Sequence, residues 1–132
     1  MKKLMVLISL ILLVVVSSVE AASLSGGTYP VEVNAPNGTY TAYWMIKVDD
    51  SNISGMSDWK ALHGFRQFIH SLKGKVSGNQ VTIIRNCVEL DQPSCKQTYT
   101  GTIGIDFIEG SWSAATGGGG TWKLFLNRPL NK

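Results

Sequence analysis

Residues 72–83, LKGKVSGNQVTI, alternate apolar and polar side chains on both sides of a Gly78-Asn79 pair. Alternation with a period of two is typical of a β-strand that buries one face. A Gly-Asn pair between two such runs predicts a two-residue hairpin turn. The stretch therefore predicts a β-hairpin, with Gly74 among the residues of its apolar face.

Residues 99–112, YTGTIGIDFIEGSW, repeat this pattern around a turn near Asp106. Gly101 and Gly110 again occupy positions on the apolar face. Glycine costs stability inside a strand, so its repeated use there needs a structural reason. A sheet that coils and closes uses inward-facing glycines as points of bending. The repeat therefore predicts a strongly curved sheet.

Further runs rich in β-branched and aromatic residues extend the pattern in both directions. Turn residues separate them, as in Pro36-Asn37-Gly38. We expect eight strands, at Thr28–Asn34, Thr39–Asp49, Ile53–Lys60, Arg66–Ser77, Gln80–Cys87, Cys95–Gly104, Phe107–Ser113 and Thr121–Asn127.

Short strands, short turns and the lack of a crossover segment predict an all-β fold. We expect an antiparallel up-and-down meander that closes into a barrel of about eight strands. Closure removes exposed strand edges, and a barrel of this size is either filled by side chains or holds one small ligand. A two-sheet β-sandwich is the alternative that the connection lengths leave open.

The first 21 residues predict a signal peptide. Lys2 and Lys3 precede an apolar run over 4–16, and Val19 and Ala21 suit the −3 and −1 positions of a cleavage site. The run is shorter than the ~20 residues that span a bilayer. We therefore expect residues 22–132 to form a single small β-barrel domain, secreted or periplasmic, with no membrane span after cleavage.

Charge and cysteine content narrow the function classes. Removal of Lys2, Lys3 and Glu20 from the 12 basic and 9 acidic residues leaves a net charge of about +2 without a basic run, which does not indicate nucleic-acid binding. Cys87 and Cys95 form an even pair in an exported chain and predict a disulfide. A metal site is the alternative, but no further cysteine or nearby histidine completes a set of four ligands.

No motif supplies the groups that an enzyme needs. Ser57 and Lys60 have a Ser-x-x-Lys spacing, but on a predicted strand rather than a helix. His63 and His70, the only histidines, lack the spacing of a zinc site. A nucleophile, a base and an orienting group are not identifiable together. We therefore expect no enzyme activity, catalytic residue, metal or cofactor.

Aromatic side chains are the best candidates for a binding site, because they line apolar pockets and stack on sugar rings. Trp112 and Trp122 share an apolar face, so we predict that both side chains belong to the core. Trp44 and Trp59 are predicted ligand-binding residues.

Strand alternation adds Arg85 and Tyr99 to the predicted ligand-binding residues, because it turns both side chains inward. A buried arginine needs a partner or a ligand. A register shift of one residue would reverse this orientation.

The glycine and aromatic pattern resembles the small exported barrels of the calycin kind, lipocalin-like and avidin-like, over residues 39–127. The Gly-x-Trp of the first lipocalin strand is missing, and a biotin-binding set is not recognisable. The resemblance implies a barrel and permits a ligand inside it. It is carried by Gly74, Val76, Gly78-Asn79, Val81, Tyr99, Gly101, Ile108, Gly110, Trp112 and Gly120-Thr-Trp122.

The sequence thus predicts an exported binding protein that holds a small apolar or sugar-like ligand at one mouth of the barrel. The alternative is a protein–protein interaction module, such as an enzyme inhibitor, that acts through loops Asp49–Asn52, Val88–Ser94 and Ala114–Gly120. Neither ligand, partner nor oligomeric state is indicated. The sequons at Asn37 and Asn52 would be glycosylated only in a eukaryotic host.

Overall fold

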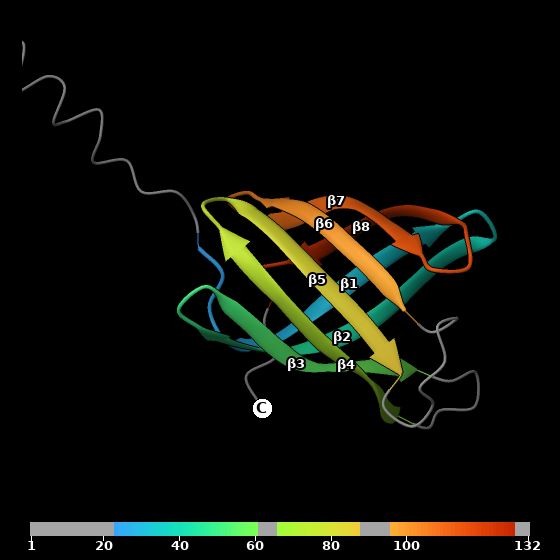
Figure 1. The fold of residues 1–132 in the computed structure, drawn as a ribbon, viewed down its shortest axis with the longest axis horizontal. Coiled ribbons are helices and arrows are strands. Elements are labelled where there is room, and N and C mark those ends of the chain that lie inside the picture. The colour runs from blue at the N-terminus through green and yellow to red at the C-terminus, as the bar shows by residue number, and fades with distance from the viewer. Residues whose placement is uncertain (1–22, 61–65, 88–95, 129–132) are drawn as a thin grey trace, which may run out of the picture.

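The computed structural model of the protein describes residues 23–60, 66–87 and 96–128, whose strands form one closed antiparallel barrel (Figure 1). Each strand pairs with the next along the chain, and β1 pairs with β8 to close the sheet. The predicted up-and-down barrel is confirmed, and the two-sheet alternative is wrong. The strands are β1 (Gly27–Ala35), β2 (Gly38–Asp49), β3 (Asn52–Lys60), β4 (Arg66–Ser77), β5 (Gln80–Cys87), β6 (Gln97–Ile103), β7 (Phe107–Ala114) and β8 (Gly119–Phe125).

The strand boundaries lie within two residues of the predicted ones; β8 begins and ends two residues earlier than predicted, and β6 begins two residues later. Gly119 and Gly120 belong to the strand and pair with β7, whereas Gly117 and Gly118 make the turn with φ angles of 102° and 87°. A run of glycines carries no side-chain alternation, so the sequence cannot indicate where the turn ends. A Cβ atom on Gly120 would collide with the backbone carbonyl of Asn34, which explains why this strand position is a glycine.

The inward glycines occupy places where neighbouring strands approach closely. Gly110 pairs with Gly101 on one side and with the buried Trp122 on the other. A Cβ atom on Gly110 would collide with the carbonyl of Thr100, and one on Gly74 with the carbonyl of Thr82. The absence of a side chain at these positions lets the sheet bend, as the repeated pattern predicts.

Aromatic rings fill the middle of the barrel. The rings of Trp44 and Trp122 stack with centroids 5.5 Å apart. Tyr99 meets both edge-on, at 5.0 Å from Trp44 and 5.5 Å from Trp122. The indole Nε1 of Trp122 donates a hydrogen bond of 2.9 Å to the carbonyl of Thr100. The aromatic middle is extended by the buried side chains of Val31, Leu72, Val81, Ile83, Ile108 and Leu124.

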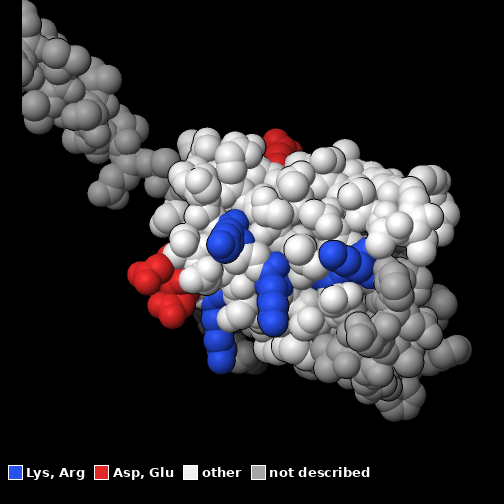
Figure 2. Space-filling view, viewed as in Figure 1, with Lys and Arg blue, Asp and Glu red and all other residues white. Residues whose placement is uncertain are grey.

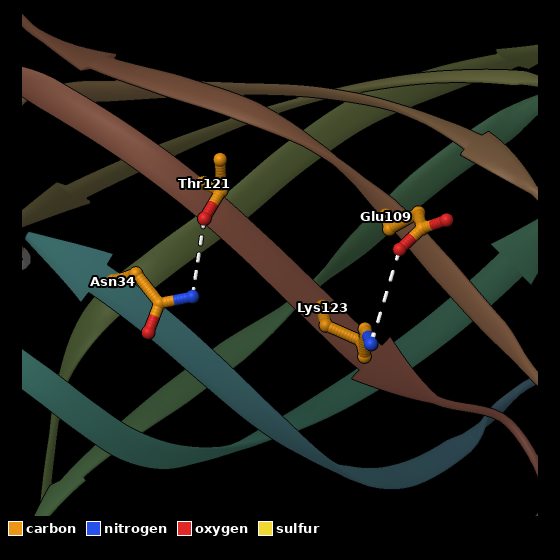
Figure 3. A network of polar contacts seen from close by, with 4 residues as sticks. All are labelled: Asn34, Glu109, Thr121 and Lys123. Carbon is orange, nitrogen blue, oxygen red and sulfur yellow. Dashed lines mark hydrogen bonds and ion pairs between the residues drawn. The ribbon is translucent and has the colours of Figure 1, made fainter.

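The seam between β8 and its neighbours carries polar contacts on the outside of the barrel (Figure 3). Asn34 Nδ2 donates to Thr121 Oγ1 at 3.1 Å, from β1 to β8. Lys123 Nζ lies 3.9 Å from a carboxylate oxygen of Glu109, between β8 and β7. Exposed ion pairs of this kind contribute little, so the seam depends mainly on backbone pairing and on inward residues such as Trp122.

The two ends of the barrel differ. The β2–β3, β4–β5 and β6–β7 connections lie at one end, on the left in Figure 1. The β1–β2 and β7–β8 connections lie at the opposite end. Within the described ranges no helix has the length and hydropathy that crossing a membrane requires. Cys87 ends β5, but its side chain and Cys95 fall outside what the structure describes, so the disulfide stays a prediction.

Candidate ligand-binding site

Four polar side chains face the interior near the end opposite the β4–β5 turn, which we call the polar end. They are on four neighbouring strands: Ser57 on β3, His70 on β4, Arg85 on β5 and Gln97 on β6. Ser57 pairs with His70, and Arg85 pairs with Gln97. Residues paired across antiparallel strands share a face, so these register pairs bring the four side chains to one side of the interior.

Arg85 is the centre of this polar group. Its side chain is only 4% exposed. Nη1 donates a hydrogen bond of 2.7 Å to Gln97 Oε1, and Nη2 lies 3.1 Å from His70 Nδ1. Tyr99 Oη donates to the same Gln97 oxygen at 2.6 Å. The planar guanidinium suits such a fixed network, because its donors point in several set directions.

The electrostatics of the polar end favour a neutral imidazole beside a charged guanidinium. Burial and, to a lesser extent, the nearby charge of Arg85 together lower the pKa of His70 from 6.5 to about 4. The unprotonated Nδ1 can then accept the hydrogen bond that Nη2 offers. Burial also raises the pKa of Tyr99, so the phenol keeps its proton and acts as a donor to Gln97.

Ser57 is fully buried, and its hydroxyl makes no hydrogen bond within the described part of the chain. It lies between Trp44 on β2 and His70 on β4, on the face that points into the barrel. A buried hydroxyl without a partner costs about 1–3 kcal/mol. Such groups are rare in folded proteins, so this one calls for an explanation.

Trp112 adds an aromatic surface to the polar end. It is half-buried on β7 and stacks on Tyr99 with centroids 6.1 Å apart. Its Nε1 donates to the carbonyl of Asn34 at 3.0 Å, which fixes the indole across β8. Gly120 makes room for this crossing, because a Cβ atom there would lie 3.1 Å from Trp112 Nε1.

The structure brings together three of the four predicted ligand-binding residues. Arg85 and Tyr99 point inward, as alternation predicts, and Trp44 touches Tyr99 in the aromatic middle. Trp59 pairs with Ala42 through β3, but its side chain is outside the described residues. Contact of any of these residues with a ligand stays a prediction.

Sequence reasoning missed the other members of the polar end. His70 and Gln97 each lie two positions from a residue that points inward, Leu72 and Tyr99, so the same alternation could have found them. Trp112, which the sequence predicts as core, is half-buried and packs against the core cluster. In the described part of the chain, no three His, Cys, Asp or Glu side chains are close enough to hold a metal ion.

The chain was compared with known families, curated proteins and solved structures. No family model matches it, and no curated protein or solved structure is significantly similar.

Proposed function

We propose that the protein is an exported binding protein that holds a small sugar-like ligand at the polar end of its barrel. The observation that carries the proposal is the buried, inward-facing hydroxyl of Ser57, which has no hydrogen-bond partner within the described ranges. It adjoins a network of Arg85, His70 and Gln97 that offers both donors and acceptors.

The chemistry of the polar end favours a sugar-like ligand over a purely apolar one. An apolar ligand would cover the partly exposed His70 and Gln97 without replacing their contacts with water, which costs free energy. A sugar presents hydroxyl groups that donate and accept hydrogen bonds. The half-buried ring of Trp112 offers an aromatic surface against which the apolar face of a sugar ring could pack.

The aromatic middle limits how deep a ligand can enter. Trp44, Tyr99 and Trp122 contact one another and are almost completely buried. Native cores are close-packed, so opening this cluster for a ligand would be costly. The ligand therefore occupies the polar end above these rings.

Native mass spectrometry of the protein recovered from its own host tests the proposal. We expect a bound compound of sugar-like composition that is released when the protein is denatured. Arg85→Met and Ser57→Ala should lose most of this compound, because each removes a hydrogen-bonding group from the polar end. Ser111→Ala is the matched control, since Ser111 is exposed on the outside of β7, and it should retain the compound.

Two results would contradict the proposal. One is a retained compound without hydrogen-bonding groups. The other is full retention by both Arg85→Met and Ser57→Ala.

The alternative function, a protein-binding module, requires its loops to form one surface. Of the three loops predicted to do so, Asp49–Asn52 lies at the left end of the barrel in Figure 1 and Ala114–Gly120 at the opposite end. One partner cannot contact both ends at once without wrapping the barrel. Val88–Ser94 lies outside the described residues. The structure therefore does not favour this set of loops as a single binding surface.

A calycin-like relationship forms part of the proposal. The closed antiparallel barrel of eight strands is compatible with it. Support comes from the architecture and from the placement of a candidate site at one end of the barrel.

A further inference from the structure

The outside of β2–β5 carries three exposed lysines, and no acidic side chain that the structure describes lies between them. Lys47 on β2 and Lys73 on β4 both flank Ser54 of β3 in register, and Lys75 lies two residues beyond Lys73. Strand spacing places the Cα atoms of Lys47 and Lys73 roughly 10 Å apart. None of the three lysines forms an ion pair with an acidic residue in the described ranges.

Apolar side chains lie among these lysines. A groove of about 410 Å³ at Gly55 is lined by Met45, Met56 and Lys47. Met45 is 37% exposed, which is high for a large apolar side chain. A second groove, of about 450 Å³ at Gly74, is lined by Lys73, Lys75, Thr82 and Ile84. We call this outer surface of β2–β5 the lysine face.

The charge of the molecule is unevenly distributed around the barrel. Figure 2 shows basic side chains along the face that β4 and β5 present to the viewer, with acidic side chains at its edges. Asp49 and Asp50 lie at the β2–β3 turn, at one end of the lysine face. On the far side of the barrel, Lys123 is compensated by Glu109, and Glu32 is close by. Among the described residues, the lysine face combines lysines that form no ion pair with apolar side chains that are exposed or partly exposed.

We propose that the lysine face docks on the surface of an anionic lipid bilayer. Lysines near such a surface are attracted to its headgroups, and apolar side chains beside them can enter the boundary between headgroups and acyl chains. A soluble polyanion would use the lysines but would gain nothing from Met45, Met56 and Ile84. The apolar side chains therefore favour a bilayer as the partner.

Vesicle co-sedimentation of the exported protein tests this proposal. The protein should bind vesicles of phosphatidylcholine mixed with phosphatidylglycerol, and it should bind vesicles of phosphatidylcholine alone at least about tenfold more weakly. Added salt should weaken the binding, because salt screens exposed charges. Asp49→Asn combined with Asp50→Asn should strengthen it, because repulsion at the edge of the face is removed.

Charge-matched variants locate the contact. Lys47→Gln, Lys73→Gln and Lys75→Gln together should weaken binding by about tenfold or more. The control combines Lys96→Gln, Lys123→Gln and Arg128→Gln, which removes the same charge elsewhere, and it should stay within about twofold of the parent. Circular dichroism of both triple variants checks that the barrel is intact.

Three outcomes would overturn the proposal. One is equal binding to both kinds of vesicle, and another is equal loss in the two triple variants. The third concerns the apolar groups. Met45→Ser combined with Met56→Ser should weaken vesicle binding. If this double variant binds vesicles as the parent does, and the parent binds soluble polyphosphate as tightly as it binds vesicles, the partner is a soluble polyanion and the proposal fails.

Discussion

The aromatic middle and the polar end of the barrel are built from the same strands but satisfy opposite requirements. In the middle, Trp122 has its single polar atom paired with the backbone and its ring packed against Trp44 and Tyr99. At the polar end, Ser57 is equally buried and its hydroxyl has no partner within the described ranges. Stability explains the first arrangement. The second costs stability, and the proposed ligand contact would explain why it is kept.

The largest expected effect is in the aromatic middle. Trp122→Ala removes a fully packed ring and should lower the free energy of unfolding by about 3–5 kcal/mol. Urea unfolding monitored by circular dichroism measures this. Trp112→Ala is the comparison, and its cost should be clearly smaller because Trp112 is only half-buried. Equal losses would mean that Trp112 belongs to the core, and the distinction between the two regions would fail.

Barrel closure predicts an intermediate effect. Gly110→Ala places a Cβ atom against the carbonyl of Thr100, so adjacent strands must separate, and we expect a loss of about 1–3 kcal/mol. Gly78→Ala has open space around its Cβ atom but a φ of 61°, so its cost should be about 1 kcal/mol. Thermal unfolding compares the two. A higher cost at Gly78 would show that turn geometry, rather than strand approach, limits closure.

The pH dependence of stability probes the polar end with a smaller effect. The pKa of His70 is about 4 in the folded protein and near 6.5 when unfolded. The unfolded chain therefore binds the proton first as pH falls, and the contribution of His70 to stability is full above pH 6.5 and declines toward pH 4. Because the ring is partly exposed, we expect a loss of about 1 kcal/mol.

The free energy of unfolding at roughly pH 7.5, 5.5 and 4.5 measures this decline. These three values span the titration of a histidine. His70→Gln should remove part of the pH dependence. If the His70→Gln variant has the same pH profile of stability as the parent, His70 is not a desolvated, neutral ring in the folded protein.

Much of the fold follows from the sequence because strands and their burial are encoded locally. The period-two runs predict all eight strands, and Gly74, Gly101 and Gly110 predict the curvature that closes the sheet. Alternation also places Arg85 and Tyr99 inside. These features depend on single strands or hairpins, for which residues close in sequence carry the information.

Alternation can turn His70 and Gln97 inward, but it does not predict that they meet Ser57 and Arg85 at the polar end. This meeting depends on which residues of β3, β4, β5 and β6 lie level with one another, and a bulge between Ser57 and Asp58 shifts the β3–β4 register. The role of Gln97 as the shared acceptor of Arg85 and Tyr99 arises only when β5 and β6 are paired. Alternation within a strand shows which face of the sheet a side chain is on, but the register between strands decides which side chains meet.

The unfolding free energy of Ser57→Ala tests the central claim most directly. If the hydroxyl is buried at a cost, its removal should raise the stability of the ligand-free protein by about 1 kcal/mol, within the penalty for an unsatisfied buried group. Ser111→Ala, on the outside, should change it by less than about 0.5 kcal/mol. A loss of stability in Ser57→Ala would contradict the account, because it would show that the hydroxyl is already paired inside the folded protein.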